Sequence, residues 1–354
     1  MTPSDNYSLP ETAAPKLEGL VDQIVARPGA FLDLKTLKEA SADLDIKGVI
    51  ATLPETLTEE DFVGILKLAM LTECATDAYA AVFTEGAQQY NAPWLTRFNQ
   101  LVWVPDEHTH YTPYKWMLQT LGYTEEELER EVRDVQERHY EHCCGTTPVE
   151  LTTYGLIQEY LTDHWHGLIG QLLKPAAPFA AQCAHAIKRR ETLHTVWYRD
   201  MTAIQVEENP EMLGLVAETM RRFVMPGTRL VPEYGKNTMD WMERANVDYT
   251  HMGKELVRNF SEVAGSIRRT GELFLEATIR RGYKLGPFPP KMVRTVMNRL
   301  GGPGYGLIGE AILDKVGLPY PRSTGVTGRI RDSLRGFIMG RMDLRTVTGK
   351  TAGT

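Results

Sequence analysis

Two Glu-x-x-His motifs are the clearest chemical signal in the sequence, Glu107 to His110 and Glu191 to His194. Residues three apart on an α-helix lie on one face, so each motif can present a carboxylate and an imidazole to a common metal ion. Either motif taken alone is more often an ordinary Glu/His pair on a helix surface. The placement of further carboxylates decides between these two interpretations.

Two more glutamates precede the motifs at similar separations. Glu73 lies 34 residues before Glu107, and Glu159 lies 32 residues before Glu191. Each separation accommodates a helix, a turn and a return to the same depth. A carboxylate-bridged dimetal site takes a Glu from each of two helices and a Glu-x-x-His from each of the other two. We therefore predict one metal centre that is formed by six side chains, those of Glu73, Glu107, His110, Glu159, Glu191 and His194.

The composition of this ligand set indicates which metals it suits. Four carboxylates and two imidazoles favour iron or manganese over a tetrahedral zinc. Other acidic and histidine side chains occur nearby in the sequence, and we expect them at the surface or beside the ligands rather than on the metal. They are Asp77, His108, Asp163, His164, His166, Asp248 and His251.

The segments that must position these residues read as helical. Between residues 58 and 281 apolar residues recur at three- and four-residue spacing, which predicts amphipathic helices. Thr58, Thr124 and Thr147 stand where helix caps are expected, the last two with Glu three residues later. Glu73 shares an apolar stripe with Leu66 and Ala80, which predicts an inward-facing position. The last long helix is predicted over residues 248–281, so the fold class is all-α.

Three segments are predicted from the change in amino-acid composition along the chain. Residues 1–57 read as an N-terminal arm with short helices, 58–283 as the helical bundle domain, and 284–354 as a Gly/Pro-rich extension with short helices near 291–299 and 330–342. The net charge is −7, yet residues 280–354 hold 14 Lys and Arg against 4 Asp and Glu. This basic stretch suggests an anionic partner or simple subunit packing.

Composition excludes several classes of protein. The chain has 354 residues, of which 42% are hydrophobic and 24% charged, which argues against fibrous or wholly disordered proteins. No apolar run is long enough for a membrane span, and no secretory signal is visible, so we expect a cytoplasmic protein. The 4 cysteines form no C-x-x-C pair, which argues against a structural zinc site. The basic residues lack interleaved aromatics, so a nucleic-acid partner is not expected.

Residues 58–234 resemble the bacterial branch of the soluble acyl-[acyl-carrier-protein] desaturases, which belong to the ferritin-like diiron proteins. The likeness rests on four motifs and on the 52 residues between Glu107 and Glu159. The motifs are Met70-Leu-Thr-Glu73, Trp103-Val-Pro-Asp-Glu107-His-Thr-His110, Gln158-Glu159-Tyr-Leu-Thr162 and Glu191-Thr-Leu-His194. The resemblance implies a ferritin-like four-helix diiron bundle with additional helices and a basic C-terminal extension.

The resemblance also implies roles for single residues. Two iron ions, cycling between Fe2+ and Fe3+, would be bridged by Glu107 and Glu191, and each would be bound by a further Glu and a His. Thr162 would be the catalytic threonine beside the oxygen-binding side of the cluster. The alternative for Thr162 is a hydroxyl that only bonds back to the carbonyl four residues earlier.

The function implied is a dioxygen-dependent desaturase that acts on an acyl chain carried by acyl carrier protein. A ferredoxin-type electron donor and a homodimer belong to the same expectation, and paired arginines such as Arg268/Arg269 would receive the acidic carrier at the mouth of the acyl channel. The alternatives are a diiron hydroxylase or N-oxygenase, and a non-catalytic ferritin-like metal-binding protein. Neither acyl chain length nor double-bond position can be read from the sequence.

Three departures from the desaturase pattern concern the route of electrons. Family members usually carry an Asp directly before the second Glu-x-x-His, linked to an N-terminal Trp, whereas this chain has Arg190 there and no Trp before Trp94. Pro105 stands two residues before Glu107, where a mid-helix Pro predicts a kink. The N-terminal arm also lacks the family's usual Pro/Trp-rich stretch.

Overall fold

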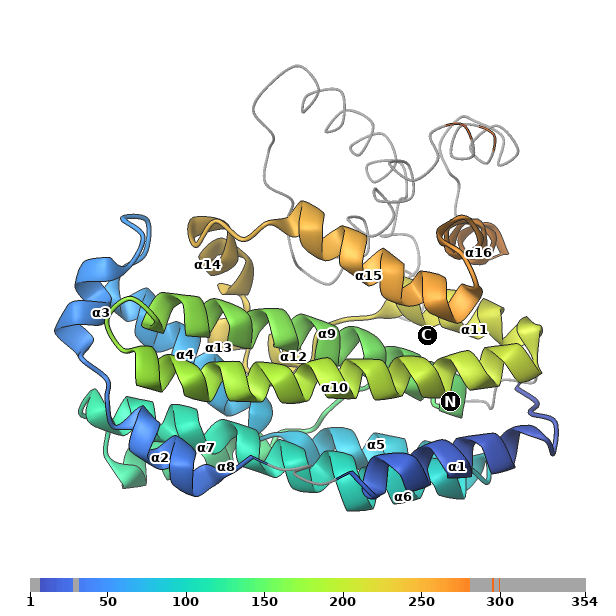
Figure 1. Ribbon diagram of the computed structural model, residues 1–354, viewed down its shortest axis with the longest axis horizontal. Helices are drawn as coiled ribbons and strands as arrows, with labels where there is room; N and C mark the ends of the chain where they lie inside the picture. Colours follow the sequence, from blue (N-terminus) through green and yellow to red (C-terminus); the bar gives the residue numbers. More distant parts are fainter. Residues whose placement is uncertain (1–6, 28–31, 281–294, 296–298, 300–354) are drawn as a thin grey trace, which may run out of the picture. The chain divides into compact units, whose positions relative to one another are not determined.

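The computed structural model describes residues 7–27 and 32–280, together with positions 295 and 299 (Figure 1). Every secondary-structure element in these ranges is helical, which confirms the all-α fold class. Contacts group the chain into two compact units. The first comprises residues 1–212 and 223–247, and the second comprises residues 213–222 and 248–354.

Four helices of the first unit form the bundle that carries the predicted ligands. They are α4 (Glu59–Glu73), α7 (Val104–Thr120), α9 (Pro148–Leu173) and α10 (Pro178–Glu208). A short turn joins α9 to α10, and the two helices pack against each other over much of their length, as Figure 1 shows, while α4 packs on α7. Within α9 every residue except His164 and Gln171 is buried. This helix is therefore the centre of the unit, and any carboxylate on it lies in the interior.

Shorter elements surround this bundle in the first unit. They are α1 (Ala13–Val25), α2 (Leu34–Ser41), α3 (Ile46–Thr52), α5 (Thr76–Gln89), α6 (Pro93–Phe98), a π-helical turn (Asn99–Trp103), α8 (Glu125–Gln136), a 3-10 turn (Pro210–Met212), α12 (Gly227–Leu230), α13 (Pro232–Gly235) and α14 (Thr238–Arg244). The second unit contains α11 (Leu213–Arg222), α15 (Tyr249–Ala264) and α16 (Ile267–Arg280). Within it α16 packs against both α11 and α15.

Capping boxes begin α4, α8 and α9 at the predicted threonines. In each, the Thr hydroxyl accepts a hydrogen bond from the backbone N–H three residues later, and the acidic side chain there accepts one from the Thr N–H. Glu127 and Glu150 fill the acidic position as predicted, and Asp61 fills it in α4. These caps fix where the ligand-bearing helices α4 and α9 start.

The structure corrects three details of the predicted helices. The helix expected over 248–281 is two helices, because Gly265 ends α15 in a left-handed conformation with φ 82°. The stripe from Leu66 to Ala80 is interrupted, since α4 ends at Glu73 and α5 begins at Thr76. Pro105 does not stand inside a regular α-helix, because it is the second residue of α7, which directly follows the π-helical turn that ends at Trp103.

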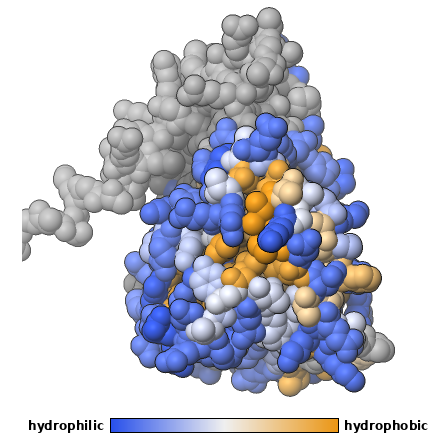
Figure 2. Space-filling model, turned by 90° about the vertical axis from the view of Figure 1, so that its left-hand side faces the viewer, coloured by the Kyte–Doolittle hydropathy of each residue, from blue (hydrophilic) through white to orange (hydrophobic). Residues whose placement is uncertain are grey.

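Apolar side chains are exposed at one end of the bundle. The turn between α9 and α10 lies at the left-hand end in Figure 1, and Figure 2 shows hydrophobic side chains gathered on that side among hydrophilic ones. Phe179, the second residue of α10, is 58% exposed. None of the helices in the described ranges is long and apolar enough to cross a membrane. The predicted boundary at residue 284 and, apart from positions 295 and 299, the extension beyond it lie outside the described residues, and the boundary at residue 58 stays a prediction.

Candidate metal centre

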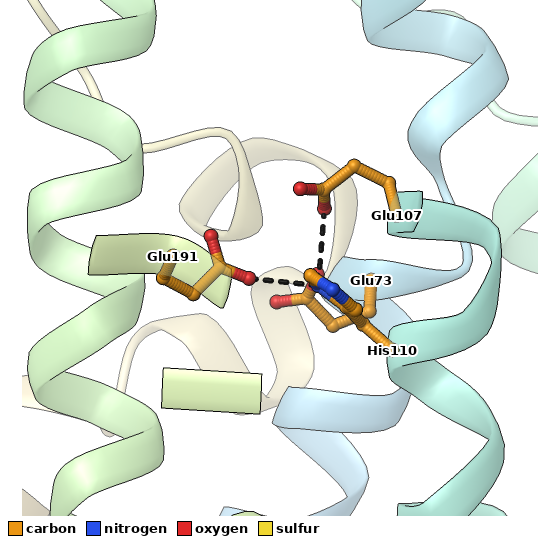
Figure 3. Close-up of side chains that lie close together, drawn as sticks. All are labelled: Glu73, Glu107, His110 and Glu191. Carbon is orange, nitrogen blue, oxygen red and sulfur yellow. Dashed lines mark ion pairs between the residues drawn. The ribbon is translucent and has the colours of Figure 1, made fainter. Parts of the chain in front are cut away.

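The six predicted ligand side chains converge in the interior of the four-helix bundle. Glu73 ends α4, Glu107 and His110 lie in the first half of α7, Glu159 lies near the middle of α9, and Glu191 and His194 lie near the middle of α10. All six are at most 5% exposed. Figure 3 shows Glu73, Glu107, His110 and Glu191 pointing toward one another from three helices, with Glu107 and His110 on the same one.

The side chains form two overlapping groups. Ligand atoms of Glu73, Glu107, His110 and Glu191 lie within 4.8 Å of one another, and so do those of Glu107, Glu159, Glu191 and His194. Glu107 and Glu191 belong to both groups, whereas each group has its own terminal Glu and His. Two metal positions bridged by two carboxylates are the arrangement that such sharing produces.

The polar atoms at the centre of the site lack hydrogen bonds within the described structure. Nδ1 of His110 lies 2.8 Å from Oε1 of Glu191, and Nδ1 of His194 lies 2.8 Å from Oε1 of Glu107. None of these four atoms is in a hydrogen bond of acceptable geometry. Buried polar atoms without hydrogen bonds are rare in folded proteins, and a bound ion is one reason for them. The donor set therefore fits metal ions between the two groups.

The charges of the site oppose one another at short range. Burial disfavours an imidazolium at His110, but the carboxylates of Glu107 and Glu191 raise its pKa well above the ordinary value. The pKa of His194 is raised against burial in the same way, by the contact with Asp106 and by the nearby carboxylates of its group. Burial and the charges of Glu107 and Glu191 raise the pKa of Glu159. Protons on these side chains thus compensate the negative charge that bound metal ions would neutralise.

A carboxylate outside the predicted set contacts both histidines. Oδ2 of Asp106 lies 2.9 Å from Nε2 of His194, and Oδ1 lies 3.8 Å from Nε2 of His110. Asp106 also accepts a hydrogen bond of 2.6 Å from Nε of Arg190. A carboxylate on the outer nitrogen of a metal-binding histidine fixes its tautomer and ring orientation. Arg190, which departs from the desaturase pattern, is thus the counterion of this Asp.

The two terminal glutamates, Glu73 and Glu159, each have a further polar partner. Nε2 of His166 lies 3.2 Å from Oε1 of Glu73, and the hydroxyl of Tyr114 lies 2.6 Å from Nδ1 of the same imidazole. Trp103 donates a hydrogen bond of 3.1 Å from Nε1 to Oε1 of Glu159. These contacts orient carboxylates that would otherwise rotate freely in the cavity between the helices.

Thr162 lies beside one of the shared carboxylates. Its hydroxyl is 3.2 Å from Oε2 of Glu191 and also lies 3.1 Å and 3.3 Å from the carbonyls of Glu159 and Gln158. The bond back to the carbonyl four residues earlier is therefore present together with a contact to a predicted ligand, and the catalytic role of Thr162 stays a prediction. The side chain is buried, with 6% exposure.

The remaining acidic and histidine side chains lie where they were expected. Asp77 and His108 pair with each other at the surface, and Asp248 caps α15 by accepting the N–H of His251. Asp163 pairs with Lys188 and Thr192. The contacts of Asp106, Trp103 and Tyr114 were missed. The available signal was position, because Asp106 directly precedes Glu107 and lies four residues before His110.

A comparison with protein families decides the identity of this bundle. The profile described as fatty acid desaturase matches residues 24–262, which is more than half of the chain. The chain belongs to the soluble acyl-[acyl-carrier-protein] desaturase family. Its members are oxidoreductases of fatty acid metabolism, and the buried carboxylates and imidazoles of this desaturase fit a diiron centre. Among curated proteins no match to the sequence is found.

Proposed function

We propose that this protein is a dioxygen-dependent desaturase that introduces a double bond into an acyl chain carried on acyl carrier protein. The observation that carries the proposal is the pair of four-residue groups sharing Glu107 and Glu191, in a chain of the desaturase family. Two buried metal positions that share two carboxylates suit oxidation chemistry, in which the metal supplies the reactivity and the protein supplies binding and electrostatics.

Two bound iron ions would supply the oxidising power, with electrons from an external donor such as a ferredoxin. Overall, two hydrogen atoms leave the acyl chain, and together with two electrons and two protons they reduce one dioxygen to two waters. One iron would be held by Glu73 and His110, and the other by Glu159 and His194. Both irons would share Glu107 and Glu191 as ligands. The near-complete burial of these side chains excludes water from the reaction.

Thr162 is proposed to hold a proton close to the shared carboxylate of Glu191. Its hydroxyl donates a hydrogen bond of 3.2 Å to Oε2 of that side chain. Thr162→Val keeps the shape but removes the donor, and Thr162→Ser keeps the donor. We expect both variants to hold iron normally, and only Thr162→Val to consume dioxygen without forming a matching amount of product. Equal coupling in both variants would overturn the role of the hydroxyl.

The function is tested with the purified, iron-loaded chain and a ferredoxin reducing system. Saturated C16 and C18 chains are supplied on acyl carrier protein, on coenzyme A and as free acids, under labelled dioxygen. A double bond without label in the organic product supports desaturation. Label in the product indicates a hydroxylase or N-oxygenase instead, and turnover with none of the substrates favours a metal-binding protein without catalysis. Glu107→Ala should be inactive, whereas Asp248→Ala, whose side chain only caps α15, should be active.

Docking of the acidic carrier is proposed to use Arg268 and Arg269 on α16. Arg190 is buried against Asp106, and Arg221 is buried with Glu218 as a partner, so neither contributes to a surface pair. Arg268 and Arg269 have side chains that are 68% and 45% exposed, although both also approach Glu272. Reversing both to Glu should raise KM for the carrier-bound substrate and weaken its salt dependence, with unchanged iron content. An unchanged KM would favour a carrier other than acyl carrier protein.

A further inference from the structure

Cys143 and Cys144 form a vicinal thiol pair in the segment between α8 and α9. Their sulfur atoms lie 3.6 Å apart. Cys144 is fully buried, whereas Cys143 is partly exposed. Of the other two cysteines, Cys74 is buried in the turn between α4 and α5 and Cys183 is buried on α10, and neither contacts a thiol within the described part of the chain. A small solute can therefore reach one thiol of the pair and neither of the other two.

The surroundings of Cys143 favour its thiolate. A hydrogen bond from Cys144 outweighs burial, and the charge of Arg229 adds to it, so that the pKa of Cys143 is lowered to about 7. Burial instead raises the pKa of both Cys74 and Cys183 to about 12. Because the thiolate is the nucleophile in cysteine chemistry, Cys143 is distinguished from the two isolated cysteines by reactivity as well as access.

Contacts on both sides hold the pair in place. The hydroxyls of Tyr140 and Tyr154 lie 2.7 Å apart, and Nη1 of Arg229 donates to the carbonyl of Glu141 over 2.9 Å. On the other side a Cβ at Gly145 would collide with the carboxylate of Glu150, so the backbone there passes directly against the start of α9. The two sulfur atoms are therefore kept close by the fold and not only by their adjacency in the chain.

We propose that Cys143 and Cys144 are a site of oxidative modification by hydrogen peroxide, at which they form a reversible vicinal disulfide. The Cys143 thiolate attacks one oxygen of the peroxide and the O–O bond breaks. The departing oxygen is protonated and released as water, and Cys143 becomes a sulfenic acid. The Cys144 sulfur then attacks the Cys143 sulfur, which forms the S–S bond and expels the second water. In total two thiols and one peroxide give one disulfide and two waters.

The ring that results explains why this modification would be reversible. Consecutive Cα atoms are about 3.8 Å apart, whereas Cα separations of about 4.4–6.8 Å are usual for a disulfide. A vicinal disulfide is therefore strained and easily reduced, and a thiol such as glutathione can restore both cysteines. The segment leads directly into α9, the helix that bears Glu159 and Thr162.

The test treats the full, iron-loaded chain with one equivalent of hydrogen peroxide and measures intact mass and peptide masses. We expect the loss of two hydrogen atoms, located in the peptide that holds both cysteines, and its reversal by glutathione. The rate should rise with pH through about 7 and then level off, since the thiolate reacts. Cys144→Ser should instead leave a sulfenic acid on Cys143 that dimedone traps, and Cys143→Ser should abolish both products.

The other cysteines of the same chain provide the internal control. Cys74 and Cys183 should stay fully alkylatable after unfolding in every sample. A Glu107→Ala/Glu191→Ala variant, which should hold no iron, must show the same disulfide if the thiols react with peroxide directly. Oxidation of Cys74 or Cys183 as fast as Cys143, an uptake of oxygen without the disulfide, or a disulfide that requires iron would each overturn the proposal.

Discussion

Arg190 donates a hydrogen bond of 2.6 Å to the buried carboxylate of Asp106, and that carboxylate in turn lies 2.9 Å from the outer nitrogen of His194. His194 on α10 thus has its carboxylate partner on α7. Arg190, directly before the second Glu-x-x-His, balances the charge of that carboxylate.

Variants of the Asp106–Arg190 pair can distinguish its two roles, which are to balance a buried charge and to orient the ligating His194. Asp106→Asn should lower iron affinity about 10- to 100-fold, because the outer partner of a ligating histidine is weakened. It should also destabilise the fold by about 3–5 kcal/mol, because Arg190 is left as an unpaired buried charge. The double variant Asp106→Asn/Arg190→Met should regain stability in urea unfolding but not iron affinity. Asp163→Asn, which breaks a pair with Lys188, is the matched control and should bind iron normally.

The shared glutamates should differ from the terminal ones in how much metal their loss costs. Glu107→Ala and Glu191→Ala each remove an oxygen ligand from both groups, so we expect both metal positions to be lost. Glu73→Ala and Glu159→Ala each affect one group, so one position should persist. Iron content by elemental analysis and the visible absorption of the oxidised protein measure this. Equal iron loss in all four variants would contradict two overlapping positions.

Iron binding should weaken as the solution becomes more acidic. Surrounding carboxylates raise the pKa of His110 and His194 above the ordinary value, so the site without metal favours protonated imidazoles. Metal binding must release these protons, and a lower pH therefore favours the metal-free form. Ferrous iron titrations at several pH values, with proton release followed in weak buffer, check the sign. Affinity that does not change with pH would contradict it.

The link between α4 and α14 should stabilise the first unit in a pH-dependent way. Arg244 forms two hydrogen bonds of 2.7 Å to the oxygens of Asp61, and Trp241 donates a third of 2.8 Å. Arg244 lowers the pKa of Asp61 against its burial. The stabilisation that comes from a lowered carboxyl pKa is fully present above the pKa of the unfolded chain, about 3.9, and is lost as the pH falls below that value. Asp61→Asn should cost about 1.5–3 kcal/mol at neutral pH in urea unfolding and less in acid, whereas exposed Asp77→Asn should cost little.

The predicted ligand positions could be found in the sequence because each Glu-x-x-His pair lies on a single helix. Glu107 and His110, or Glu191 and His194, share a helix face whatever the rest of the fold does, and the separations to Glu73 and Glu159 then identified the partner helices. The family match and the convergence of these side chains agree with that prediction.

Contacts between helices could not be predicted in the same way. Asp106 faces His194 from another helix, and His166 faces Glu73, and such pairings depend on helix rotation and on the order in which helices pack. The helix ends at Glu73 and Gly265 were missed for a related reason. Apolar periodicity continues across both breaks, so the pattern alone predicts one helix where the chain forms two.

The end of α4 at Glu73 gives the two metal positions unequal mechanical compliance. Glu159 sits in the interior of a 26-residue helix, where hydrogen bonds on both sides hold its backbone. Glu73 is the last residue of its helix and is followed by the break before α5, so fewer ladder hydrogen bonds restrain it. When the metal charge changes, the carboxylate at the helix end can shift at lower cost than the one at mid-helix. The metal position that includes Glu159 is thus held more rigidly than the one that includes Glu73, although both have the same types of ligand.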